Sequence, residues 1–203
     1  MSKLLLDILS VKKYIFSNEM PLRNFDVFDN FIWRTTQKFH SIYLSTGETK
    51  HTREKFKFLF ETIQTENLIT DIKIGEPDFS TYIPLRRYDS LFLKECNWLS
   101  IDNLLEAKAK DIDVKFVTPV SPDDAIKILK TWIEGTKLKE MTLMEVGPLS
   151  SKENVMKQAD MLGGVSRCND PKAFENRRQM KRVTDGKIAV FHIVFNRLTI
   201  RIL

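Results

Sequence analysis

A short strand pattern followed by an amphipathic helix recurs along this chain, and the recurrence constrains the fold more than any other feature of the sequence. The strand segments alternate apolar and polar residues, with β-branched or aromatic residues at the apolar positions, as strands buried on one face do. Their centres follow one another at intervals of roughly 20–29 residues, which leaves room for a helix between successive strands. The five predicted strands are residues 40–45, 68–74, 90–95, 111–116 and 140–146.

Helices are predicted between and after these strands. The clearest signal is in residues 121–135, where Ser121 suits the N-cap, Pro122 the first helical position and Gly135 a left-handed C-terminal residue. A second segment, residues 52–65, places its apolar side chains on one stripe of a helix. The four predicted helices are residues 52–65, 100–110, 121–135 and 150–164.

Strands joined by helical crossovers pair in parallel, and a single strand–helix unit cannot bury its apolar face unless further units stack on it. Because the strands alternate rather than being apolar throughout, one face of the sheet is expected to pack on the helices and the other to contact water. We therefore predict an α/β fold, a leucine-rich-repeat-like stack of strand–helix units with parallel strands, closed by a C-terminal antiparallel β-meander.

The end of the chain breaks the strand–helix rhythm. Asp185-Gly186 is a strong signal for a tight turn, and Asn196 tolerates the positive φ of a second turn. These turns separate three strand segments, residues 179–184, 187–195 and 198–203. The sequence thus predicts one structural domain in three parts: an N-terminal helical segment (residues 1–39) packing on the array, the strand–helix array (residues 40–164) and a basic β-meander cap (residues 165–203).

An exposed face is expected where the polar positions of successive strands lie side by side. A face with mixed charges, one aromatic residue and one methionine suits selective contact with another protein. We predict that a protein ligand docks on a face made of Asp71, Lys73, Phe92, Lys94, Asp113, Lys115, Thr142 and Met144.

The sequence lacks the patterns that catalysis, cofactors and metals require. Its three histidines lie far apart, and no nucleophile elbow or glycine-rich phosphate loop occurs. Two isolated cysteines, Cys96 and Cys168, make neither a disulfide framework nor a metal site. No apolar run reaches the length of a membrane span. We therefore predict no catalytic residue, no cofactor, no metal and no membrane contact, and a cytoplasmic or nuclear location.

Basic residues are concentrated near the end of the chain, where residues 165–203 hold nine Lys/Arg and three Asp/Glu. Nucleic-acid binding is the alternative that this charge raises, because phosphates bind clustered Lys and Arg. Only Phe174 lies close in sequence as a stacking platform, and a strand would point alternate residues to opposite faces. We therefore favour a solvated surface for Arg177, Arg178, Lys181 and Arg182.

Five segments carry a family resemblance through their order and spacing. They are residues 98–105 (WLSIDNLL), 111–116 (DIDVKF), 123–135 (DDAIKILKTWIEG), 138–145 (LKEMTLME) and 181–189 (KRVTDGKIA). Together they resemble the F-box-associated domain (type 2) of the nematode families of F-box proteins. The resemblance implies a domain that selects substrates for ubiquitin ligases and does not itself catalyse a reaction.

In that family the domain follows an F-box, a helical module that docks on the adaptor of a cullin–RING ligase. Residues 1–39 contain no recognisable F-box, so adaptor binding is expected only if an F-box lies upstream. The sequence thus predicts a non-catalytic protein-recognition domain resembling the substrate-binding part of F-box ubiquitin-ligase receptors, with a protein ligand of open identity. The alternative is a stand-alone interaction protein that contacts nucleic acid through its basic C-terminal segment.

Overall fold

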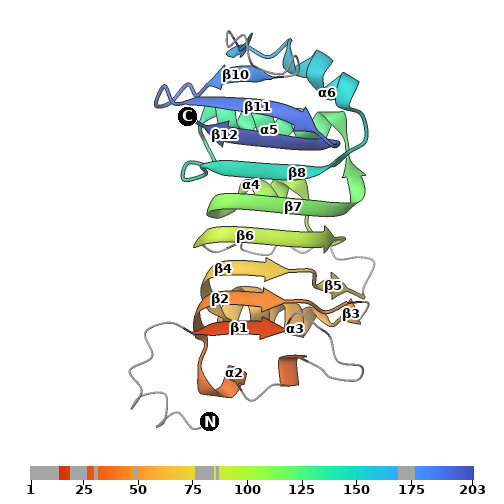
Figure 1. Cartoon of the computed structure of the whole chain (residues 1–203), viewed down its shortest axis with the longest axis vertical. Helices are drawn as coiled ribbons and strands as arrows, with labels where there is room; N and C mark the ends of the chain where they lie inside the picture. The colour runs from red at the N-terminus through yellow and green to blue at the C-terminus, as the bar shows by residue number, and fades with distance from the viewer. Residues whose placement is uncertain are drawn as a thin grey trace.

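A ten-stranded sheet runs the length of the computed structural model, which describes residues 14–18, 27–29, 32–47, 50–75, 85, 87–168 and 177–203 (Figure 1). The first six strands across the sheet pair in parallel, and the remaining pairs are antiparallel. The chain is therefore a mixed α/β protein. In order across the sheet, the strands are β1 (Ile15–Asn18), β2 (Lys38–Leu44), β4 (Gln64–Thr70), β6 (Arg87–Cys96), β7 (Lys108–Val120), β8 (Leu143–Leu149), β12 (Arg197–Ile202), β11 (Ile188–Val194), β10 (Arg178–Lys181) and β9 (Val165–Arg167).

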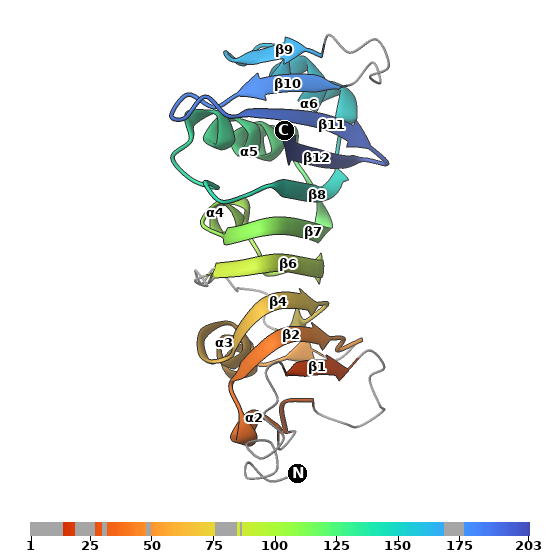
Figure 2. The same ribbon diagram turned by 60° about the vertical axis from the view of Figure 1, so that its left-hand side comes forward.

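The helices of the array lie on one side of this sheet, as Figure 2 shows for α3, α4 and α5. A second, two-stranded sheet pairs β3 (Lys50–His51) with β5 (Lys73–Ile74). The helical elements are η1 (Val27–Asp29), α2 (Ile32–Thr35), α3 (Arg53–Lys57), the π-helical η2 (Phe58–Thr62), α4 (Ile101–Leu105), α5 (Pro122–Glu134) and α6 (Lys152–Ala159). In the part of the chain that the structure describes, no helix combines the length and apolar character needed to cross a bilayer.

Four of the five repeating strands, together with the residues just before them, bury three residues at a spacing of three and then two, whereas β4 buries Leu68 and Thr70 and leaves Thr65 partly exposed. In β6, Tyr88, Leu91 and Leu93 are at most 3% exposed. The register aligns the last two of these with the equivalent residues of the neighbouring strands. The same spacing gives Phe39, Ile42 and Leu44; Ala109, Ile112 and Val114; and Met141, Met144 and Val146, all buried. These aligned rows form the core between the sheet and the helices.

The predicted caps of the helix at residues 121–135 are confirmed. The hydroxyl of Ser121 accepts a hydrogen bond from the backbone N–H of Asp124 at 3.1 Å, and Gly135 ends α5 with φ of 71°. Ser100 and Ser151 cap α4 and α6 in the same way. The structure also explains Gly135 by packing, since a Cβ there would lie 2.1 Å from the Thr184 hydroxyl oxygen.

The helix predicted over residues 52–65 is shorter and changes type. It begins as α3 and continues as the π-helical η2 up to Thr62, and β4 starts at Gln64. The predicted apolar stripe is nevertheless buried, with Phe56 stacked on Phe60 at 4.5 Å and in edge contact with Trp98 at 4.3 Å. The aromatic core therefore decides where this helix packs.

Other boundaries were wrong as well. The helix predicted over residues 100–110 ends at Leu105, and the helix predicted over residues 150–164 ends at Ala159. The strand predicted over residues 68–74 ends at Thr70, whose hydroxyl accepts a hydrogen bond from the Ile72 backbone N–H; the chain then leaves the large sheet and enters β5. The N-terminal segment, residues 1–39, was expected to be helical, but Ile15 and Phe16 lie in β1, which extends the sheet beside β2. Residues 1–13 of that segment lie outside the described residues.

The last strands form the predicted antiparallel meander and continue the sheet from β8. Strand β12 pairs with β8, β11 with β12, and β10 with β11. The turn between β11 and β12 consists of Phe195 and Asn196, both with positive φ, and the Asn196 carbonyl accepts a hydrogen bond from the Leu149 backbone N–H. The turn therefore lies directly against the end of β8.

We expect Gly147→Ala to lower the free energy of unfolding by about 1–3 kcal/mol, because the added methyl overpacks this junction. A Cβ at position 147 would lie 2.9 Å from Arg197 Cγ and 3.0 Å from the Asn196 carbonyl oxygen. Urea denaturation measures the change. Gly163→Ala is the matched control, since a Cβ there meets nothing within 4 Å; equal stability of the two variants would contradict the packing described for β8.

Candidate functional site

One row of side chains crosses the face of the sheet that lies away from the helices, which we call the open face. Its members occupy matched positions on five neighbouring parallel strands, and all five are partly exposed. The rows on either side of it within the strands are buried in the core, so the row is presented outward by strict alternation. From β2 to β8 the row consists of Tyr43, Ile69, Phe92, Asp113 and Glu145.

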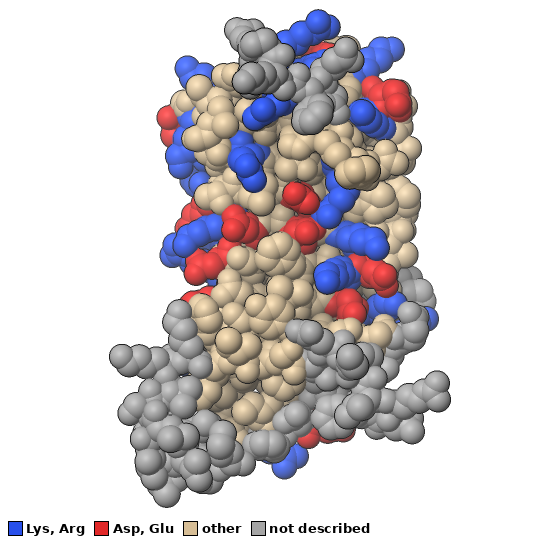
Figure 3. Space-filling view, viewed as in Figure 1, with Lys and Arg blue, Asp and Glu red and all other residues tan. Residues whose placement is uncertain are grey.

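The row changes character along its length. Figure 3 shows a largely uncharged surface over β2, β4 and β6, and acidic and basic side chains side by side over β7 and β8. The uncharged part contains Tyr43, Ile69 and Phe92, contributed by three adjacent strands about 4.8 Å apart. An aromatic and aliphatic strip of this kind is the composition found at the centres of protein-binding surfaces.

A hollow of about 350 Å³ opens beside this strip, where β2 and β4 end. Tyr43 and Ile69 line it together with Asp71 and Lys94. Asp71 is fixed in place because its carboxylate accepts hydrogen bonds from the Ser45 hydroxyl at 2.7 Å and from the backbone N–H of Thr46 at 2.6 Å. The hollow thus has an apolar wall and a charged rim held in a defined position.

Arg197 organises the charged part of the open face. It comes from β12 and forms ion pairs with Asp113 and with Glu145, the latter at 3.5 Å. All three side chains are about one-third exposed, between 31% and 36%. Next to them, the Thr142 hydroxyl donates to Asp111 at 2.6 Å. Within this cluster the carboxylates of Asp111, Asp113 and Glu145 outnumber the one guanidinium group.

Most of the eight side chains predicted for the exposed face are accessible. Asp71, Phe92 and Asp113 are partly exposed on the open face, and Lys94, Lys115 and Thr142 are exposed. Lys73 lies in β5 rather than in the large sheet, where its ammonium group pairs with Glu95 at 3.0 Å. Whether these residues bind a ligand stays a prediction.

Met144 was placed on the wrong face. It is 0% exposed and aligned with Ile112 of β7 and Ile200 of β12 in a core row. The prediction placed Thr142 outward and, by strict alternation, Met144 outward as well. In the structure the buried residue before Met144 is Met141, three positions earlier rather than two. A single extra residue before a strand reverses the side to which every later side chain points.

The residues missed by sequence reasoning are Tyr43, Ile69, Glu145 and Arg197. Alternation within the predicted strand places Tyr43 on the face opposite to that of the buried Ile42 and Leu44. The sequence therefore did contain a signal for Tyr43. Glu145 was missed for the same reason that misplaced Met144. Arg197 pairs with a residue 84 positions away, and no local pattern predicts that contact.

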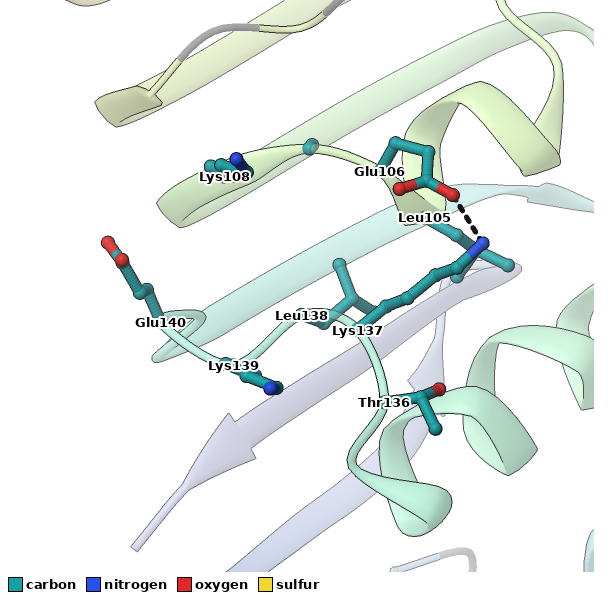
Figure 4. Close-up of a pocket in the computed structure, with 9 residues that line it drawn as sticks. Leu105, Glu106, Lys108, Thr136, Lys137, Leu138, Lys139 and Glu140 are labelled. Carbon is teal, nitrogen blue, oxygen red and sulfur yellow. Dashed lines mark ion pairs between the residues drawn. The ribbon is translucent and has the colours of Figure 1, made fainter.

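A second hollow, which we call the edge hollow, lies where β7 and β8 begin. It has a volume of about 260 Å³ and is lined by residues 105–108 and 136–140. Figure 4 shows the two loops that form it, joined at one end by the ion pair between Glu106 and Lys137. Buried Leu105, Ala107 and Leu138 provide its apolar floor.

The basic C-terminal segment is only partly available to a ligand. Arg178 is 7% exposed and binds the Asp160 carboxylate through two nitrogens, at 2.6 and 3.1 Å, which lowers the pKa of Asp160. Arg182 is 1% exposed, stacks over Trp132 with its guanidinium carbon 4.6 Å from the ring centre, and donates to backbone carbonyls. Two of the four arginines and lysines considered for phosphate binding are therefore internal.

Titratable groups in the described part of the chain form no cluster of three that would hold a metal ion. Burial lowers the pKa of His51 and of His192, and the nearby positive charge of Arg177 contributes for His192. Burial also raises the pKa of the Cys96 thiol, which makes it a poor nucleophile. These groups act as core or strand residues.

A family model matches part of the chain. Residues 81–146 match the family model described as F-box associated, which confirms the resemblance seen in the sequence over that stretch. The matched segment contains β6, α4, β7, α5 and the start of β8, including three members of the exposed row and all residues that line the edge hollow. No curated protein and no solved structure matches the chain.

Proposed function

We propose that this chain is a non-catalytic recognition domain that binds a protein ligand on its open face, in the substrate-binding role of F-box-associated domains. The observation that carries the proposal is the row from Tyr43 to Glu145, in which apolar and aromatic side chains pass into an ion-paired cluster on adjacent strands. Protein-binding surfaces combine such an apolar centre with a charged rim.

The architecture supports a leucine-rich-repeat-like interpretation of the array. Buried residues recur at the spacing of three and then two that such repeats use, and parallel strands in chain order carry helical segments on one side. In arrays of this type the exposed strand residues form one extended surface. The division at residue 165 fits this proposal, with β12 to β9 continuing the sheet beyond the last parallel strand, whereas β1 adds part of residues 1–39 to the sheet.

The family match favours a role in selecting substrates for ubiquitylation. In that role the open face holds the substrate, and an F-box in the same polypeptide or on a partner supplies contact with the ligase. Function without a cofactor follows from the proposal, since recognition requires shape and charge alone.

Nucleic acid is the less favoured ligand. The guanidinium groups of Arg178 and Arg182 already bind Asp160 and the carbonyls of Leu138 and Lys139. A phosphate that binds these arginines would have to break their existing contacts, which costs free energy. An exposed lysine can bind a phosphate without that cost. This leaves Lys181 as an exposed member of the predicted basic group.

Site-specific photo-crosslinking tests the proposal. With benzoylphenylalanine in place of Phe92, we expect the full chain to crosslink to a discrete protein in an extract of the cells that express it. The same group at Lys130, an exposed position of α5 on the helix side, is the control and is expected to give no such product.

If the crosslinked product reports specific binding, its yield falls when the surface next to Phe92 is changed. Ile69→Ser removes an apolar neighbour of Phe92 in the row, so the crosslink at position 92 should weaken severalfold. Equal crosslinking from both positions, or a product insensitive to Ile69→Ser, would count against recognition by the open face.

A further inference from the structure

The edge hollow has the size of an anchor for one or two side chains. Its volume of about 260 Å³ lies below the roughly 300–1,000 Å³ that small-molecule and cofactor sites occupy. Leu105 and Leu138, at 2% and 4% exposure, form an apolar floor between polar loop residues. A hollow with these properties suits part of a peptide rather than a whole cofactor.

The loop that forms one wall is held in a fixed shape. Arg182 donates to the carbonyl oxygens of Leu138 and Lys139, at 3.5 and 3.4 Å, while it stacks on Trp132. Leu138 itself has φ of 56°, a left-handed conformation that is unfavourable for a residue with a side chain. Strain of this kind persists where surrounding contacts impose it, and such positions cluster at binding sites. The loop is therefore preorganised before any ligand arrives.

The charges around the hollow do not balance. Glu106 pairs with Lys137, and Glu140 pairs with Arg87 at 3.0 Å, so both carboxylates already have cationic partners. Lys108 and Lys139 are exposed, and neither forms an ion pair with any residue that the structure describes. The hollow thus presents an apolar floor with two uncompensated positive charges at its rim.

We propose that the edge hollow is a second binding site, which takes an acidic segment of a protein partner with an apolar side chain next to a carboxylate. The apolar side chain covers Leu138, and the carboxylate lies between Lys108 and Lys139. This site is separate from the open face in position and opposite in charge to the carboxylate cluster around Arg197. Its existence does not depend on what the open face binds.

Nuclear magnetic resonance of the full chain tests the proposal with defined probes. At low salt, a peptide that alternates leucine and glutamate is expected to shift the backbone amide signals of residues 106–108 and 136–140. The double variant Lys108→Glu/Lys139→Glu is expected to weaken this binding by about tenfold or more, since two favourable contacts become repulsive. Lys157→Glu makes the same charge change at an exposed position of α6 and should leave the affinity unchanged.

Three results at the edge hollow itself would overturn the proposal. They are an unchanged affinity in the double variant with its amide spectrum otherwise preserved, equal binding of a peptide that alternates leucine and lysine, and tighter binding of a single-stranded oligonucleotide at the same residues. The last outcome would assign the lysines to phosphate instead. Shifts confined to Tyr43, Ile69 and Phe92 would also reject the edge hollow, while leaving the open face as a binding surface.

Discussion

Replacing Met144 by lysine is expected to lower the free energy of unfolding by more than about 4 kcal/mol, or to prevent folding, because it places an unpaired charge in the core. Met144 is 0% exposed and lies between Ile112 and Ile200 in a row that continues across the sheet. Neither neighbour offers a counter-charge or a hydrogen-bond acceptor on its side chain. Urea denaturation followed by circular dichroism measures the loss.

Thr142→Lys is the matched control, two residues earlier. Thr142 is exposed, and its hydroxyl donates to Asp111 and to the Lys110 carbonyl, so the substitution should cost no more than about 1–2 kcal/mol. If Met144→Lys does not fold, Met144→Ala keeps the comparison measurable, with an expected loss of about 2–5 kcal/mol. Similar stabilities for the variants at positions 142 and 144 would contradict the register of β8.

Removing the side chain of Arg182 is expected to cost about 3–5 kcal/mol, since buried partners lose a charged donor. The residue is 1% exposed and connects three elements: it covers Trp132 of α5, hydrogen-bonds the loop before β8, and pairs with Asp185 at 3.3 Å. Arg182→Ala therefore leaves carbonyl groups unsatisfied and a cavity over the indole ring. Thermal unfolding of the purified chain measures the effect.

Two comparisons separate the contributions of Arg182. Arg182→Met keeps most of the volume but removes the donors, so its loss should be smaller than that of alanine. Arg201→Ala removes an exposed arginine of β12 and should change stability by less than about 0.5 kcal/mol. Equal effects of Arg182→Ala and Arg201→Ala would mean that Arg182 does not hold the loop.

Local sequence patterns predicted the parts of this fold that local forces determine. The caps Ser121 and Gly135 were correct because capping depends on a few neighbouring atoms. The strands β2, β4, β6, β7 and β8 of the array and β10, β11 and β12 of the meander were found, since alternation reports burial on one face, whereas the short edge strands β1 and β9 were not predicted. Helix type was not predictable in the same way, because packing of Phe56 and Phe60 against Trp98 accompanies the change to a π-helix.

Sequence patterns could place residues of the candidate site only where the signal lies within a single strand. Alternation placed Phe92 and Asp113 correctly. Met144 was misplaced because strict alternation assumes that buried residues are two positions apart, whereas Met144 follows the buried Met141 by three. The partners of Asp113 could not be predicted at all, since Arg197 reaches it through the pairing of β12 with β8. The loops of the edge hollow likewise depend on Arg182, which lies more than forty positions further along the chain.

Affinity for the protein crosslinked at position 92 tests recognition by the open face most directly. The measurement is the dissociation constant of that purified protein for the native chain and for Ile69→Ser/Phe92→Ser, in parallel with Lys130→Glu on the helix side. We predict a loss of affinity of about tenfold or more for the double variant, as expected for removal of central apolar contacts, and no change for Lys130→Glu. Equal affinity of a correctly folded double variant would contradict the account.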